Sequence, residues 1–361
     1  MCVKLKNMLL LALVVFGCTS CGVANEAMDE EEIENNNVVI QDHSTEKPGE
    51  VSKYKVFRGE IRGINTLAKP QIYFPAGSDY RQLEDETEEE ESTWEDKENN
   101  YLIVEPGSVR YTTQQFYDTY ETLLYDKKGK FRENFDEILE KGSITDVSEE
   151  RAIETVNDII EKNNFSIKDT KTYSLTKDNL TKLSKMFMSD QEYKEYMKDP
   201  ANEPMKRDFV KRDEGYLVVM SVCAGENVLY HNDYDYGERF YCGSYIWAIV
   251  NKEGLVTFQA SGIYNVDSSE PEEIEVLSLE NAKQAMNQKF ENIISTDKVE
   301  CKEIQQSYLA VSDGKSETVS FIPVYVFLIE QKINDSKGGK RLEAVETMSL
   351  ILDMENGKWI E

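Results

Sequence analysis

The chain is poor in the residue type that carries most acid–base chemistry near neutral pH. Its 361 residues include only two histidines, His43 and His231. Neither has a serine or cysteine nucleophile in a recognisable setting, and no G-x-S-x-G or H-E-x-x-H motif is present. A glycosidase needs two carboxylates at a defined separation, and among 69 acidic residues such a pair can be neither assigned nor excluded. We therefore predict that the protein is not an enzyme and has no catalytic residues.

Positive charge is also scarce. The chain has 41 Lys and Arg against 69 Asp and Glu, a net charge of −28. Nucleic-acid binding depends on basic side chains that neutralise phosphates, so this composition excludes nucleic acid as the expected partner. Anionic lipid headgroups should repel the chain for the same reason.

Long apolar runs are missing except near the first residue. Lys4 and Lys6 precede an apolar stretch at residues 8–16, and small residues with Cys18 and Cys21 follow. This stretch is shorter than the roughly 20 apolar residues that a membrane-spanning helix needs. A basic segment, a short apolar segment and a small-residue site together indicate a secretory signal.

The residues around the two cysteines resemble the lipobox of bacterial lipoproteins. That pattern has an aliphatic residue, two small residues and the cysteine that receives the lipid. Cys18 fits except for the bulky Phe16, and Cys21 fits except that Cys18 stands where an aliphatic residue is expected. The resemblance implies an anchor at Cys18, with Cys21 as the alternative, on the extracytoplasmic face of the cell membrane. An ordinary signal peptide with free secretion is the competing interpretation.

Few cysteines remain for other roles once Cys2 and the lipidated residue are set aside. Cys223 and Cys242 lie on two neighbouring predicted strands and form a candidate disulfide outside the cytoplasm. Two buried free thiols are the alternative, and Cys301 is left without a partner in either case. No Cys/His spacing is typical of a zinc site, so we predict no metal and no cofactor.

Composition and periodicity divide the chain into five segments. Residues 1–21 form the signal and lipobox, and residues 22–50 are predicted to be a disordered acidic tether because they offer little apolar surface to bury. Residues 51–145 should form an N-terminal β/α region, in which residues 84–91 are an acidic insert. Residues 146–270 and 271–361 should each form a module.

The two modules show a weak internal repeat. In each, an amphipathic helix is followed by long strands and then by a tight turn into a last strand. The helices begin near Ser148 and at Ser278, and the turns contain Gly254 and Gly357. We therefore predict an α+β fold of antiparallel sheets, each covered by an amphipathic helix.

The second module resembles a PepSY domain. The resemblance rests on the helix opening at residues 277–285, the strands at residues 308–309 and 322–327, and the closing turn at residues 352–358. Tandem copies in an exported chain are similar to the YycH/YycI regulatory proteins of Gram-positive bacteria. The segment from Phe165 to Val210 departs from the pattern. The resemblance implies a non-catalytic protein that binds or regulates an envelope protein such as a sensor kinase or peptidase.

One polar–aromatic stretch, residues 230–242, is a candidate binding loop. Its tyrosines suit stacking on sugar rings or on a partner, and its carboxylates weakly match a calcium loop whose full ligand pattern is absent. A hairpin loop whose tyrosines pack on the sheet rim is the alternative. The candidate residues are Tyr230, Asp233, Tyr234, Asp235, Tyr236 and Tyr241.

A second stretch, residues 186–197, is rich in methionine and aromatic residues at helical spacing. Methionine suits adaptable interfaces, but core packing is the favoured interpretation here. The sequence as a whole predicts an exported, lipid-anchored binding or regulatory protein. A cell-wall glycan-binding module or hydrolase is the alternative.

Overall fold

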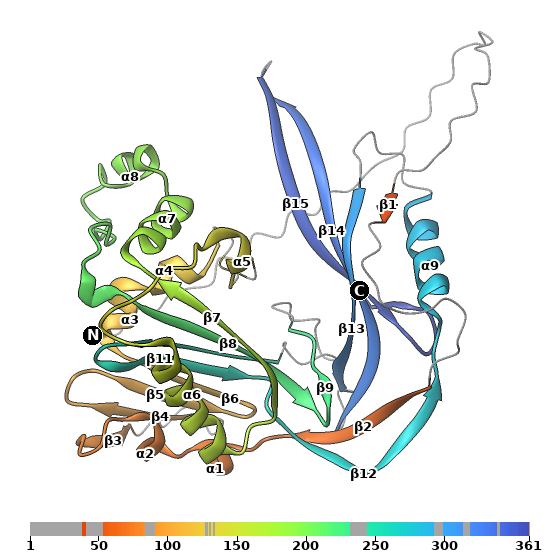
Figure 1. The fold of residues 1–361 in the computed structure, drawn as a ribbon, viewed down its shortest axis with the longest axis horizontal. Helices are drawn as coiled ribbons and strands as arrows, with labels where there is room; N and C mark the ends of the chain where they lie inside the picture. Colours follow the sequence, from red (N-terminus) through yellow and green to blue (C-terminus); the bar gives the residue numbers. More distant parts are fainter. Residues whose placement is uncertain are drawn as a thin grey trace. The chain divides into compact units, whose positions relative to one another are not determined.

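The computed structural model describes residues 38–40, 53–83, 91–126, 129, 131–132, 134–231, 244–291, 299–312, 318–337 and 340–360. Internal contacts divide the chain into residues 1–36 and residues 37–361, and every described residue belongs to the second unit. Within it, helices and two largely antiparallel sheets form an α+β fold, as the sequence predicts (Figure 1).

The first sheet has nine described strands, all paired antiparallel. In spatial order they are β3 (Tyr80–Leu83), β4 (Ser92–Asp96), β5 (Tyr101–Glu105), β6 (Ser108–Thr112), β11 (Gly254–Ser261), β10 (Tyr245–Asn251), β8 (Gly215–Ala224) and β7 (Ile167–Leu175), with the short β9 (Asn227–Val228) beside β8.

The second sheet has seven described strands. Its main path runs β1 (Val38–Ile40), β13 (Val299–Ser312), β14 (Thr318–Lys337), β15 (Lys340–Asp353) and β16 (Trp359–Ile360). Off this path, β2 (Lys53–Ile61) pairs with both β12 (Tyr264–Glu275) and β14. The β1–β13 pair is parallel, whereas the other pairs are antiparallel.

The same order of elements occurs twice. Helix α6 (Glu149–Asn163) precedes β7, β8, β10 and β11, and helix α9 (Leu279–Glu291) precedes β13, β14, β15 and β16. In each set the four strands are neighbours in sequence order. Helix α6 contacts the middle strands β8 and β10. Helix α9 packs through Ala282 and Met286 in one apolar cluster with Tyr325 of β14 and Leu352 of β15, the corresponding strands.

The turn before the last strand is also alike in the two sets. Asn251 Oδ1 accepts a hydrogen bond from the Glu253 amide at 2.8 Å, and Asp353 Oδ1 accepts one from the Glu355 amide at 2.8 Å. An Asn or Asp side chain that bonds to the backbone two residues later stabilises a tight turn. The two sets of elements therefore share this turn contact as well as the order of one helix and four neighbouring strands.

The nine-stranded sheet separates two apolar clusters because successive side chains of a strand point to opposite faces. Along β8, Val218 and Met220 belong to one cluster and Leu217 to the other. The first cluster also takes in α1 (Ile64–Leu67), α2 (Pro70–Tyr73) and α6, and the second takes in α3 (Gln114–Thr119), α4 (Glu121–Leu124), α5 (Phe135–Ile138) and α7 (Lys177–Phe187). Helices therefore pack on both faces of this sheet.

Sheet pairing crosses the domain boundaries predicted from composition. Strands β3 to β6, from the segment 51–145, extend the same sheet as the strands of segment 146–270. Strand β2 joins the sheet that contains segment 271–361. Segment 51–145 therefore contributes strands to both sheets, and such pairing between distant strands leaves no mark in local composition. Within the predicted tether 22–50, the structure describes only Val38–Ile40, and these residues form β1.

Tyr308 of β13 connects segments from both sheets. Its backbone oxygen accepts from the Tyr230 amide at 2.7 Å, and Tyr230 follows β9. Its hydroxyl donates to the Lys55 carbonyl of β2 at 2.8 Å, and its ring lies 5.9 Å from that of Phe57. Burial raises the pKa of Tyr308 to about 12. The phenol therefore remains a donor at physiological pH.

Candidate functional site

A long insertion separates the first and second strands of the first repeat. We define the α7–α8 insertion as residues 176–214, between β7 and β8. It contains α7, α8 (Asp190–Tyr196) and the 3₁₀ turn η1 (Lys211–Asp213). Connections in compact domains are usually much shorter, and long ones are often functional. In the second repeat, β13 ends at Ser312 and β14 begins at Thr318, so the corresponding connection is short.

Helix α7 attaches the insertion to the sheet. Thr176 caps it by accepting from the Asn179 amide at 3.2 Å. Leu180 and Leu183 are fully buried in the same cluster as Trp247 of β10. Their spacing of three residues places both on one face of the helix, which is the face that contacts the domain.

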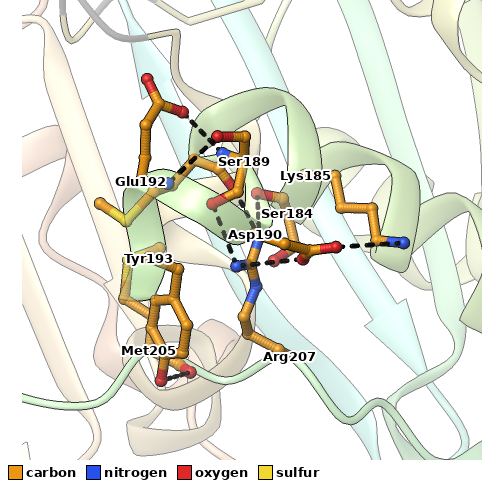
Figure 2. A network of polar contacts seen from close by, with 9 residues as sticks. Ser184, Lys185, Ser189, Asp190, Glu192, Tyr193, Met205 and Arg207 are labelled. Atoms are coloured by element: carbon orange, nitrogen blue, oxygen red, sulfur yellow. Dashed lines mark hydrogen bonds and ion pairs between the residues drawn. The ribbon is translucent and has the colours of Figure 1, made fainter. Parts of the chain in front are cut away.

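Helix α8 has the opposite character, because none of its residues is buried. Its start is fixed by a capping box: Ser189 Oγ accepts from the Glu192 amide at 3.2 Å, and Glu192 Oε2 accepts from the Ser189 amide at 2.7 Å (Figure 2). Met186 and Met197, on either side of α8, are 41% and 38% exposed. The favoured prediction of core packing for residues 186–197 is therefore wrong for most of this stretch.

Arg207, in the part of the insertion between α8 and η1, contacts the start of α8. Its guanidinium donates to the carbonyls of Met188 and of Ser184, the latter at 3.4 Å, and forms an ion pair with Asp190 at 3.5 Å (Figure 2). It also lies 4.7 Å from the Tyr193 ring centroid. Ser184 lies in the last turn of α7 and Met188 is its C-cap, and a cation near this end interacts favourably with the helix dipole. Arg207 thus positions α8, which has no buried side chain of its own.

The end of the insertion is anchored by a buried carboxylate. Asp213 is 1% exposed, and its Oδ1 lies 2.7 Å from Lys206 Nζ. Its Oδ2 accepts from the Val210 amide at 2.8 Å, and its backbone oxygen accepts from the Tyr120 hydroxyl at 2.5 Å. Burial raises the pKa of Tyr120, which keeps the phenol protonated as a donor. With Phe209 in the core, these contacts fix the chain where it re-enters the sheet.

A second polar cluster lies at the end of α6. Arg62 is 9% exposed and donates to the carbonyls of Asn163 and Asn164 at 2.7 and 3.2 Å. The Asn163 side chain donates through Nδ2 to the Tyr73 hydroxyl at 3.0 Å. Arg62 supplies a cation and donors to free helix carbonyls, so its role is to cap α6.

Only some of the predicted site residues lie within the part of the chain that the structure describes. Cys18 and Cys21 lie outside the described residues, as do residues 232–242 of the candidate loop, which include Cys242. Tyr230 is described and packs against an apolar cluster of β13, β14 and β15, whereas Asp233, Tyr234, Asp235, Tyr236 and Tyr241 are not described. Cys223 and Cys301 are both buried and neither is bonded to another described cysteine, and burial raises the pKa of the Cys223 thiol. The predicted Cys223–Cys242 pairing stays a prediction.

The described residues contain neither a cluster of metal ligands nor a membrane-spanning helix. No group of three or more His, Cys, Asp or Glu side chains there is arranged to hold a metal ion. No described helix is long and apolar enough to cross a membrane.

Sequence reasoning missed the role of Arg207. A single arginine in a loop forms no pattern, and its partners are backbone carbonyls about 20 residues away, which no spacing rule identifies. The length of the segment between two strands was the available signal, since such a connection is unusual in a compact domain.

Comparison with known proteins gives a fold but no family. No protein-family model matches the chain, and no curated protein matches it. The chain is similar in structure to an uncharacterized protein from Eubacterium rectale, with a TM-score of 0.63 and 14% sequence identity. The match covers 91% of this chain and 92% of that one. The two proteins therefore share a fold over most of their length.

Proposed function

We propose that the chain is an exported, lipid-anchored protein that binds another envelope protein and performs no chemistry of its own. The N-terminal signal pattern with Cys18 and Cys21 supports export and anchoring. The repeated order of helix, strands and Asx turn is compatible with tandem PepSY-like modules, whose resemblance implies a binding or regulatory role. The partner class is an envelope protein such as a sensor kinase or peptidase.

The α7–α8 insertion carries the proposal. Helix α8 has no buried residue, so it does not contribute to the core. It is nevertheless held in place by Arg207, by a capping box and by the anchor at Asp213. Met186 and Met197 are among the exposed large apolar side chains of the described residues, and methionine adapts to irregular partners. We assign the contact surface to Met186, Met197 and the exposed side of α8.

Photo-crosslinking in living cells tests this surface. A photoreactive amino acid at Met186 or Met197 should capture one envelope protein, whereas the same amino acid at Tyr117 should not. Tyr117 is a matched control because it is 40% exposed and lies on α3, outside the insertion. Capture of the same protein from all three positions would contradict the assignment.

Two substitutions separate binding from folding. Met186→Asp with Met197→Asp should abolish capture from a third position on α8, such as Gln191, while stability stays within about 0.5 kcal/mol because both side chains are exposed. Tyr117→Asp should leave capture unchanged. Hydrolysis of peptidoglycan or of a peptide by the purified protein, lost on replacing one carboxylate, would overturn the non-enzymatic part of the proposal.

A further inference from the structure

The hairpin of β14 and β15 extends beyond the sheet to which it belongs. Strand β13 pairs with β14 only as far as Gln331. The pairing of β14 with β15 continues for six further residue pairs, up to Lys337 with Lys340. We call these residues, 332–337 and 340–345, the β-arm. At about 3.4 Å per residue, the β-arm reaches roughly 20 Å past the last residue pair of β13 (Figure 1).

The β-arm has one edge that continues the ladder of a paired strand. On the side of β14 away from β15, strand β13 pairs with residues 319–331, and no described strand pairs with residues 332–337. The backbone groups of such an edge are a template for another strand. A two-stranded hairpin is only marginally stable in water, and a third strand stabilises it. The edge at residues 332–337 is therefore suited to strand addition.

The β-arm is also basic within an acidic chain. It contains four Lys or Arg and two Asp or Glu, a net charge of +2, whereas the whole chain carries −28. Lys337, Lys340 and Arg341 all lie at its tip, next to Gly338 and Gly339 in the sequence. Lys337 and Lys340 are directly opposite each other in the strand register, and like charges in such a pair are destabilising. A bound anion offsets this repulsion, so the tip favours an acidic ligand.

We propose that the β-arm binds an extended acidic segment of a partner protein, which adds as a strand to the β14 edge at residues 332–337. This surface is separate from the one assigned to α8 and does not depend on a lipid anchor. A bilayer or a phosphate polymer presents a broad anionic surface to the rest of the chain, which carries −30 and repels it. A single extended segment contacts the basic β-arm without approaching most of that charge.

Fluorescence anisotropy with defined peptides tests the charge preference of the full-length protein. The probe is a labelled peptide of about ten residues in which glutamate alternates with valine or threonine. We expect it to bind at least about tenfold more tightly than the same peptide with glutamine in place of glutamate. Stronger binding of polyphosphate, or of vesicles that contain phosphatidylglycerol, would overturn the choice of a protein segment.

Two charge reversals locate the contact. Lys340→Glu places a carboxylate opposite Lys337, which favours the hairpin while it removes a cation from the tip. We expect about fivefold weaker binding of the acidic peptide, as for the loss of an exposed ion pair. Lys182→Glu is the matched control, because this side chain is 46% exposed on α7 and the charge change is the same. An unchanged affinity in Lys340→Glu, or equal losses in both variants, would overturn the assignment to the β-arm.

Hydrogen–deuterium exchange tests strand addition separately from charge. The bound acidic peptide should slow exchange over residues 332–337 by about fivefold or more, because their outward amides become hydrogen-bonded. The control peptide has two adjacent central residues replaced by proline. Successive amides of a strand point in opposite directions, so one of the two prolines removes a donor to β14. This peptide should bind more weakly and give less protection. Binding of the acidic peptide without protection of residues 332–337 would overturn strand addition.

Discussion

Asp213 fixes the end of the α7–α8 insertion, where the chain re-enters the sheet at β8. Replacing it with asparagine leaves Lys206, which is 25% exposed, without its counter-ion beside a buried site. Removing one partner of a buried pair costs about 3 kcal/mol or more, so we expect Asp213→Asn to lower the free energy of unfolding by about 3 kcal/mol. Urea denaturation measures it.

Asp190 supplies the control for this prediction. It pairs with Arg207 but is 67% exposed. Exposed pairs contribute about 0–1 kcal/mol, so Asp190→Asn should change stability by less than about 0.5 kcal/mol. Equal losses in the two variants would show that the carboxylate of Asp213 has no special structural role.

The raised pKa of Tyr308 leads us to expect that the free energy of unfolding falls at alkaline pH. Burial raises its pKa to about 12 in the folded protein, from the ordinary value of 10.0 for a tyrosine exposed to water. The folded state therefore favours the protonated phenol, and this contribution is complete below pH 10 and is lost as the pH rises toward 12. Relative to wild type, Tyr308→Phe should be less destabilised between pH 9 and pH 11, by about 1 kcal/mol. Urea denaturation at each pH gives the free energy of unfolding. An equal fall of this free energy with pH in the wild type and in Tyr308→Phe would contradict the prediction.

At the residue scale, sequence reasoning found the residues that form patterns. It placed the apolar stripe of α6 and left its start open between Asp146 and Ser148. The structure shows Ser148 as the N-cap, with its side chain accepting from the Arg151 amide at 3.2 Å, so the capping box expected at Asp146 is wrong. It did not find Arg207 or Asp213, because their partners are backbone groups and side chains brought together only by folding. Local pattern identifies helices and turns, whereas a site built from isolated polar residues needs the tertiary structure.

At the element scale, β2 depends on close approach at one glycine. A Cβ at Gly59 would lie 2.5 Å from the Asn265 carbonyl oxygen and 2.9 Å from the Phe321 ring. These residues belong to β12 and β14, the two strands with which β2 pairs. We expect Gly59→Ala to destabilise the protein by about 2–3 kcal/mol through overpacking, as measured by thermal or urea unfolding.

Gly63 is the matched control. It lies four residues further along the chain, has φ −68° and ψ 155°, and a Cβ there would meet nothing within 4 Å. Gly63→Ala should therefore be neutral or slightly stabilising. A similar loss in both variants would indicate a general backbone effect instead of close strand packing at Gly59.

The two helices of the insertion show why element prediction succeeded only in part. The sequence indicates helical spacing at residues 186–197, which the structure divides between the end of α7 and α8, whereas most of α7 was not predicted. Only α7 is buried, because Leu180 and Leu183 meet an apolar cluster that the sequence of the helix does not reveal. Amphipathic spacing identifies a helix and its apolar face but not whether a neighbour covers that face.

At the scale of the whole molecule, strand order could be predicted within each repeat but not between segments. Successive strands joined by short connections usually pair with one another, so the pairing order of β13 to β16 can be predicted from the sequence. The pairing of β2 with β14 joins residues more than 250 positions apart, and no local signal encodes it. The shared fold with the Eubacterium rectale protein at 14% identity agrees with this, since topology persists where local sequence does not.

The net charge of −28 leads to a prediction about membrane attachment. Charge opposes binding to anionic lipids, so attachment should depend on the acyl chains alone. Of Cys18→Ser and Cys21→Ser, we expect one to release the protein into the medium and the other to leave it bound. The wild type should remain with membranes in about 1 M salt, where screening leaves electrostatic contacts only a few ångströms of range. Release of the wild type by salt would mean that charge, not lipid, attaches the protein, and intact mass of the mature N-terminal peptide would identify the lipidated cysteine.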